Sequence, residues 1–188
     1  MKHLFAFLCL FLPACGGSYP PLKTVDAVDL DRYMGTWYEI MRLPNSFQKD
    51  CWNSTAEYSL RDDGKVRVVN RCRKDSVNGP ENSATGKAWV VAGSNNSKLK
   101  VSFFWPFRGD YWIIELDENY QWVAVGAPSR EYLWILAREP RWDVVPLEML
   151  KERLAAKGFD VTQLIATNDY PLAILDAAPP QIEDVEEE

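Results

Sequence analysis

Short runs of alternating apolar and polar residues recur along the chain between residues 36 and 138. In one of them Val66 and Val68 alternate with Arg67, a pattern typical of a strand with one buried face. Turn-forming residues such as Asp62-Asp63-Gly64 separate neighbouring runs. The pattern predicts eight strands, at residues 36–43, 53–61, 65–73, 84–92, 98–105, 111–117, 121–127 and 131–138.

One amphipathic helix is predicted after the strands. Leu147, Leu150 and Leu154 fall at i, i+3 and i+7 and form a single apolar stripe. Asp143 is predicted to cap the helix, and Gly158 is predicted to end it. The whole pattern therefore predicts either a β-sandwich or a closed β-barrel, with one helix packed outside.

The N-terminal residues have the organisation of an export signal. Lys2 and His3 precede an apolar run at 4–12, which is too short to span a bilayer. Cys15 follows Pro13-Ala14, and this resembles the bacterial lipobox, in which the cysteine is acylated and becomes the new N-terminus. Residues 1–14 are thus predicted to be a lipoprotein signal peptide. The alternative is an ordinary signal peptide with an incidental cysteine.

The sequence on either side of the predicted domain suggests an anchor and a tail. Gly16 after the cysteine, in place of Asp, resembles the outer-membrane type of lipoprotein. Residues 15–28 are interpreted as a lipidated tether that holds a domain at 29–176 away from the membrane surface. Residues 177–188 contain five acidic residues and no basic one, and are interpreted as a disordered acidic tail.

Composition limits the classes of function that the protein can have. Hydrophobic residues make up 47% of the chain and there are eight tryptophans, which favours a bulky core or an aromatic-lined pocket. The net charge is −6 and no basic stripe is present, so nucleic acid is not an expected partner. The one histidine, His3, lies in the predicted signal peptide. A mature chain without imidazole favours binding over catalysis, and neither a metal nor a cofactor is expected.

Two cysteines remain once the signal peptide and Cys15 are set aside. Cys51 and Cys72 flank a predicted hairpin, so their ends of the two strands should be adjacent. Export permits a disulfide, and we predict that the two residues pair. The simple register leaves Cys51 slightly out of line, so the pairing requires a bulge or a loop. Two free thiols are the alternative.

Three short motifs connect the chain with a known family. Gly35-Thr36-Trp37-Tyr38-Glu39 resembles the Gly-x-Trp signature of lipocalins. The segment 116–120 resembles the family's second block, although Leu116 stands where a threonine is usual. The segment 132–138 resembles the third block, which ends in a characteristic arginine. The chain is most similar to the bacterial outer-membrane, apolipoprotein D-like lipocalins. The resemblance implies an eight-stranded antiparallel up-and-down β-barrel with one C-terminal α-helix outside.

The resemblance also distinguishes the two ends of the barrel. Up-and-down connections bring the start of the first strand, the turn after the sixth and the end of the eighth to one end. The residues expected to close the barrel there are Gly35, Trp37, Asp117, Tyr120 and Arg138. The opposite end is expected to be an open mouth, with a rim that includes Trp52, Trp105, Phe107 and Arg108.

Alternation along the strands assigns the side chains that should face the interior. The predicted cavity residues are Tyr58, Val68, Asn70, Ala88, Val90, Val101, Phe103, Ile113, Tyr132 and Trp134. Small side chains on the fourth strand favour an open cavity. The alternative is a barrel that is completely filled by its own side chains.

The sequence is consistent with three functions. The leading hypothesis is storage or transport of a fatty acid, lysophospholipid or phospholipid at the outer membrane, with the oligomeric state undefined. The second is an envelope interaction or scaffold lipoprotein that uses its rim or its acidic tail. The third is a lipocalin-like enzyme, for which Glu39, Glu115 and Asn70 are the polar candidates inside the barrel.

Overall fold

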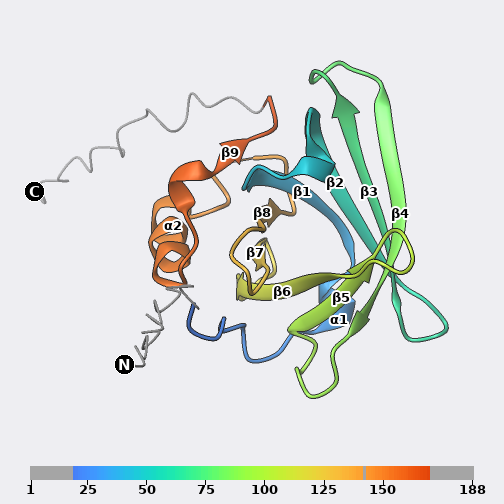
Figure 1. Ribbon diagram of the computed structural model, residues 1–188, viewed down its shortest axis with the longest axis vertical. Coiled ribbons are helices and arrows are strands. Elements are labelled where there is room, and N and C mark those ends of the chain that lie inside the picture. The colour runs from blue at the N-terminus through green and yellow to red at the C-terminus, as the bar shows by residue number, and fades with distance from the viewer. Residues whose placement is uncertain (1–18, 142, 170–188) are drawn as a thin grey trace, which may run out of the picture.

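The computed structural model describes residues 19–141 and 143–169. The predicted signal peptide, Cys15 and the acidic tail lie outside these ranges. Eight antiparallel strands are hydrogen-bonded in sequence order, and β1 also pairs with β8, so the sheet closes into a barrel (Figure 1). The strands are β1 Gly35–Arg42, β2 Cys51–Leu60, β3 Val66–Lys74, β4 Glu81–Val90, β5 Lys98–Ser102, β6 Gly109–Leu116, β7 Trp122–Gly126 and β8 Leu133–Ala137. The barrel prediction is confirmed.

Four small elements were not predicted. A four-residue helix α1, Leu30–Tyr33, precedes β1, and the carboxylate of Asp29 caps it by accepting from the backbone N–H of Asp31 at 3.0 Å. A 3-10 turn η1, Ser46–Gln48, follows β1. A second turn η2, Val161–Gln163, leads to a two-residue strand β9, Ile165–Ala166, which pairs with β1.

The alternation of side chains builds two hydrophobic clusters on the two faces of the same sheet. In β8, Trp134 and Leu136 belong to the inner cluster, whereas Leu133, Ile135 and Ala137 belong to the outer one. All of β7 is buried, because it has packing partners on both faces. The inner cluster surrounds the barrel axis, and the outer cluster lies under α2, Leu147–Ala156 (Figure 1).

The helix has the predicted stripe but a different start. Leu147, Leu150 and Leu154 are buried in the outer cluster, as predicted. The prediction that Asp143 caps the helix is wrong, because α2 begins at Leu147 without a side-chain cap and the carboxylate of Asp143 pairs with Arg141. An ion pair within the preceding loop therefore takes the place of the cap.

The predicted end of the helix is confirmed. Gly158 has a φ of +91°, the left-handed conformation that favours glycine at this position. Its N–H donates to the carbonyl of Ala155 at 2.9 Å, and the N–H of Phe159 donates to the carbonyl of Leu154 at 3.2 Å. These two bonds satisfy carbonyls that the helix end would otherwise leave free.

At the mouth end, which is the end where β1, β3, β5 and β7 finish, the strand boundaries differ from the prediction by one to three residues, and the largest differences are in β4 and β5. β4 begins at Glu81, within a predicted loop, because Glu81 pairs with Arg73 and extends the β3–β4 ladder. β5 stops at Ser102 instead of residue 105. Pro106 has no N–H to donate to a ladder, and residues 103–108 form a loop at the rim instead.

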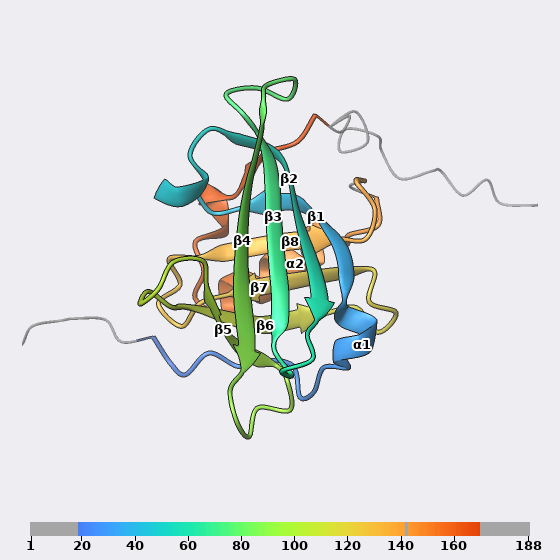
Figure 2. The same cartoon turned by 90° about the vertical axis from the view of Figure 1, so that its right-hand side faces the viewer.

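The segment 19–28 packs along the barrel, so this part of the predicted tether is not a free spacer. Leu22 is buried in the outer cluster. The N–H of Val25 donates to the carbonyl of Ile113 in β6 at 3.0 Å, and the N–H of Val28 donates to the carbonyl of Asn95 at 2.9 Å. Figure 2 shows this blue segment passing below β5 and β6 towards α1. Apolar burial and backbone pairing hold it in place.

The predicted disulfide and the predicted bulge are both confirmed. Cys51 and Cys72 are bonded, with their Cα atoms 5.4 Å apart. The β2–β3 register shifts between Trp52 and Thr55, and Asn53 within the shift has a φ of +48°. The extra residue turns the start of β2 so that Cys51 can meet Cys72 across the ladder.

Candidate ligand-binding site

The barrel encloses a cavity of about 870 Å³ that opens at the mouth end. Its lower part is lined by residues of α1, and its opening lies between η1, the β5–β6 loop and the β7–β8 loop. Most of the wall is apolar or aromatic, with a few polar groups. This size and composition are typical of sites for small hydrophobic molecules.

Most of the predicted cavity residues line this space. Val90 and Ile113 do not, although both pack with the inner cluster nearer the closed end. Ile113 is completely buried, so it fills the bottom of the barrel instead of facing a ligand. The predicted residues in the wall are Tyr58, Val68, Asn70, Ala88, Val101, Phe103, Tyr132 and Trp134.

The predicted rim residues divide into two groups. Phe107 and Arg108 line the cavity opening. Trp52 and Trp105 do not line it. Trp105 is 70% exposed and lies on the outer side of the rim, where the guanidinium of Arg108 is 5.3 Å from its ring centroid. On that outer side Trp105 lines a shallow surface pocket together with Lys65, Lys87 and Trp89, so the outer surface of the rim is aromatic and cationic.

All five predicted closure residues lie at the closed end. The guanidinium carbon of Arg138 is 3.9 Å from the ring centroid of Trp37, which is fully buried. Arg138 also donates to the backbone carbonyls of Thr36 at 2.9 Å and Arg32 at 2.6 Å. Gly35, at φ +93°, brings its backbone close to the same guanidinium. Arg138 therefore joins α1, β1 and β8.

The other two closure residues hold the β6–β7 turn against the N-terminal segment. The carboxylate of Asp117 accepts from the backbone N–H groups of Asn119 and Gln121, each at 3.1 Å. The hydroxyl of Tyr120 accepts from the N–H of Asp29 at 2.9 Å. Neither residue lines the cavity.

The floor of the cavity carries three tyrosine hydroxyls that were not predicted to meet. The hydroxyl of Tyr111 is 2.7 Å from that of Tyr33 and 3.0 Å from that of Tyr58. Burial raises the pKa of Tyr58 to about 12, and it raises the pKa values of Tyr33 and Tyr111 as well. The phenols therefore stay protonated and neutral, and they form a small polar centre at the bottom of an apolar cup.

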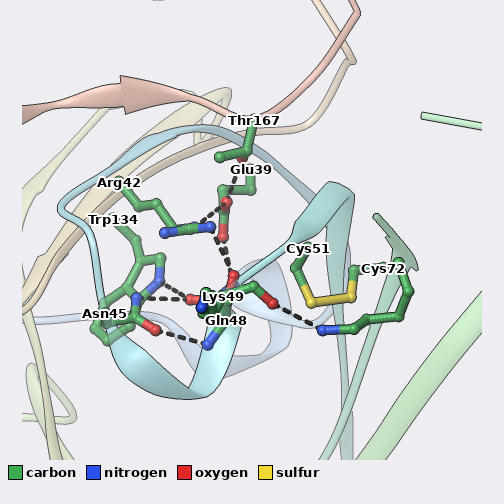
Figure 3. Close-up of a disulfide and its surroundings, with 10 residues drawn as sticks. Glu39, Arg42, Asn45, Gln48, Lys49, Cys51, Cys72, Trp134 and Thr167 are labelled. Carbon is green, nitrogen blue, oxygen red and sulfur yellow. Dashed lines mark hydrogen bonds and ion pairs between the residues drawn. A yellow bond between two sulfur atoms is a disulfide. The ribbon is translucent and has the colours of Figure 1, made fainter. Parts of the chain in front are cut away.

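A network of polar side chains lies beside the mouth, and at its centre is the buried carboxylate of Glu39 (Figure 3). The Glu39 carboxylate accepts hydrogen bonds from Arg42 Nε at 3.1 Å, from Gln48 Nε2 at 2.8 Å and from the hydroxyl of Thr167 at 2.6 Å. Gln48 in turn accepts from Trp134 Nε1 at 2.7 Å. Burial nevertheless raises the pKa of the Glu39 carboxyl above its usual value. The network ties η1 and the β9 segment to the cavity wall.

The polar candidates for catalysis do not meet inside the cup. Glu115 faces outward, where its carboxylate pairs with Lys157 at 3.2 Å and Arg153 at 3.3 Å. A register shift between Ile113 and Glu115 reverses the expected alternation in β6. Glu39 is engaged in the network at the mouth, whereas Asn70 lies in the β3 wall with its Oδ1 atom unpaired.

Several wall residues could not be assigned from alternation alone. Phe47 and Gln48 reach the opening through η1, which has no strand periodicity. Tyr33 belongs to α1, and its contribution depends on that helix folding under the barrel. Glu39 shares the inward parity of Trp37, so alternation was a usable signal for it.

The described residues contain neither a cluster of metal-binding side chains nor a membrane-spanning helix. In ranges 19–141 and 143–169, no three His, Cys, Asp or Glu side chains are grouped to hold a metal ion. Among the helices that the structure describes, none is both long and apolar enough to cross a membrane.

A closed eight-stranded barrel that holds a cavity for one small ligand is the architecture of the lipocalin class. Comparison with known families agrees, because the lipocalin-like domain model matches residues 28–169. The chain belongs to the lipocalin family. Membership and the apolar cavity together indicate that it binds a small hydrophobic ligand.

Curated relatives extend the similarity over most of the chain. The outer membrane lipoprotein Blc of Vibrio cholerae is 41% identical over 88% of this chain and 97% of its own length. The protein of that name from Escherichia coli K12 is 41% identical over 81% of this chain and 86% of its own. Apolipoprotein D of Macaca fascicularis is 32% identical, with 79% and 80% covered.

Solved structures agree on the fold. Insecticyanin from the tobacco hornworm Manduca sexta superposes with a TM-score of 0.62 at 20% identity, covering 82% of this chain and 87% of that one. At this identity the similarity supports the barrel alone.

Proposed function

We propose that the protein is a lipid-anchored lipocalin of the bacterial outer membrane that stores or carries one lipid in its barrel. The observation that carries this proposal is the apolar cavity of about 870 Å³, open at one end. The relatives named outer membrane lipoprotein support the location. Cys15 is the proposed site of acylation, because it ends a signal-like segment at the position of a lipobox cysteine.

The proposed ligand is a fatty acid, a lysophospholipid or a phospholipid, with a hydrocarbon chain inside and the polar head at the opening. Aliphatic groups such as Val68 and Val101 form the wall that would contact the chain. Arg108 stands at the opening, where an anionic head would meet water. Burial of the chain should dominate affinity, at about 25 cal/mol per Å² of apolar surface, because solvent screens the rim charge.

Two variants distinguish lipid binding inside the cavity from lipid binding at the charged rim. Trp134 lines the cavity and is held by Gln48, so Trp134→Ala should weaken binding of a fatty acid by more than Arg108→Ala does. Affinity should rise with chain length until the cavity is full, and should change little with salt. Isothermal titration calorimetry with a series of fatty acids measures both trends without depending on Trp134 as a reporter. Affinity that is independent of chain length but falls steeply with salt would place the lipid on a charged surface and contradict the proposal.

The ligand class is tested separately on the protein as isolated. Mass spectrometry of lipids that copurify with the protein should detect a long-chain lipid in a ratio of about one to one, because a barrel of this size holds one small ligand. Extraction that returns no lipid, together with no binding in the titrations, would favour the scaffold alternative.

A further inference from the structure

The large apolar side chains that remain exposed are distributed unevenly between the two ends of the barrel. In the described part of the chain, the β5–β6 loop exposes Phe104, Trp105 and Phe107 by 75%, 70% and 71%, and η1 exposes Phe47 by 64%. All four lie at the mouth end. At the closed end, the most exposed large apolar side chain among the described residues is Leu60, at 46%. Large apolar side chains that are exposed together at one end of a protein indicate contact with a membrane or a partner that shields them from water.

The described chain also begins at the mouth end. The ring of Tyr19 lies 5.1 Å from the guanidinium carbon of Arg130, in the β7–β8 loop. Arg130 donates to the carbonyl of Pro20 at 2.6 Å and to that of Lys157 at 3.0 Å. Figure 2 shows the start of this segment on the same side as the β5–β6 loop. These contacts fix the point from which the chain leads back towards Cys15.

The chain between the proposed anchor and this point is short. Cys15 precedes Tyr19 by four residues. An extended chain spans about 3.3–3.6 Å per residue, so an acylated Cys15 lies within about 14 Å of Tyr19. The ten residues of β4 run from the mouth to the closed end over about 33 Å. The mouth is therefore the end that the anchor holds near the bilayer.

Charge does not provide the attraction. The chain has a net charge of −6, which opposes binding to anionic lipid. Charges of both signs lie near the rim: Lys65, Lys87 and Arg108 lie beside Trp105, whereas Asp110 is already paired with Lys100 at 2.6 Å. Tryptophan and other amphipathic aromatics favour the interface between lipid headgroups and acyl chains, whatever the headgroup charge.

We propose that the mouth of the barrel docks on the surface of the lipid bilayer, with Phe104, Trp105, Phe107 and Phe47 inserted at the interface. The cavity then opens towards the membrane, so a lipid enters or leaves without crossing water. The inference rests on the proposed acylation of Cys15 for the direction of the tether. It does not require that the cavity bind a lipid.

The test uses the acylated protein in phosphatidylcholine vesicles that contain phospholipid brominated on its acyl chains, which quenches nearby tryptophan. Trp105 lies outside the cavity wall, so a bound ligand would not contact it. Unbrominated fatty acid is added in excess to occupy the cavity. Wild-type emission should be quenched, and Trp105→Phe, which keeps an apolar ring, should remove the largest share of that quenching. Raised salt should leave the quenching unchanged.

The matched control places a tryptophan at the other end. Leu60→Trp should add emission that the brominated lipid does not quench. Equal quenching of wild type and Trp105→Phe, quenching of the tryptophan at position 60, or loss of quenching at high salt would each overturn docking. Flotation of the protein with the vesicles is measured first. A protein that fails to float contradicts the proposed acylation, and floating protein with unquenched Trp105 contradicts the docking alone.

Discussion

The two ends of the barrel each place an arginine beside a buried group, but in opposite ways. At the closed end Arg138 is partly exposed, and it covers the ring of the fully buried Trp37 while donating to two backbone carbonyls. At the mouth Arg42 is itself buried, together with the carboxylate of Glu39. The closed end buries an apolar ring under a partly exposed cation. The other hides an ion pair.

The difference matches what each end must do. A closed end gains stability from complete apolar burial, and its cation remains partly hydrated. The mouth must stay open, so η1 and the β9 segment cannot be held by filling the space with apolar side chains. Directed hydrogen bonds from Gln48 and Thr167 to Glu39 hold these segments at the edge of the cavity instead. Such a network fixes geometry at a cost in desolvation.

The largest expected effect is at the closed end. Trp37→Ala removes a fully buried indole from under Arg138 and should destabilise the protein by about 5 kcal/mol, the upper end for such truncations. Trp105→Ala is the matched control, because that ring is exposed at the rim, and it should change stability by less than about 0.5 kcal/mol. Urea unfolding measures both. Equal losses would show that the rim is part of the folded core.

The next largest loss of stability is expected when the Arg42–Glu39 ion pair at the mouth is broken. Arg42→Met leaves the Glu39 carboxylate buried without its cation and should cost about 3 kcal/mol, because Gln48 and Thr167 still donate to it. Adding Glu39→Gln to that variant removes the uncompensated charge and should restore at least half of the loss. Urea unfolding of the two single variants and the double variant measures the coupling. Strictly additive losses would mean that the two groups do not interact.

The same carboxylate predicts a pH dependence. Burial raises the pKa of Glu39 above 4.5, so the folded protein holds this proton more tightly than the unfolded chain does. The resulting stability is present at pH values below 4.5 and is lost as the pH rises through the folded-state pKa. The slope cannot exceed about 1.4 kcal/mol per pH unit. Subtracting the free energy of unfolding of Glu39→Gln from that of the wild type at each pH isolates the contribution of this carboxyl group, and that difference should fall as the pH rises. If the wild type instead becomes more stable relative to Glu39→Gln as the pH rises, the pKa of Glu39 is lowered in the folded protein and not raised.

The closed end could be predicted from sequence because its residues lie in short motifs. Gly35 and Trp37 are two residues apart in β1, and Arg138 follows a strand whose alternation is unbroken. Alternation predicted the strands for the same reason, since it survives wherever the ladder is regular, whereas the choice of a barrel over a sandwich came from the resemblance that these motifs carry. Where a bulge interrupts β6, alternation failed, and Glu115 was placed on the wrong face.

The mouth could not be predicted in this way, because its contacts join segments far apart in sequence. Thr167 and Glu39 are 128 residues apart, and no local pattern marks their meeting. The tyrosine cluster likewise joins α1, β2 and β6 through distant side chains. Of the cavity, most of the strand positions were predicted, Glu39 among them, whereas η1, the partners of Glu39 and the meeting of the three tyrosines required the three-dimensional fold.

The smallest expected effect concerns this tyrosine cluster at the floor. Tyr111→Phe removes the hydroxyl that bridges Tyr33 and Tyr58, and it should cost about 1 kcal/mol, since two neutral hydrogen bonds are lost while the ring still fills its place. Tyr132→Phe is the matched control at the opening. Its hydroxyl has no hydrogen bond to any residue in the described ranges, so its loss should stay within about 0.5 kcal/mol. Urea unfolding of ligand-free protein compares the two. If Tyr132→Phe costs as much as Tyr111→Phe, the bridging hydroxyl contributes nothing specific, and the floor is held by the packing of its rings.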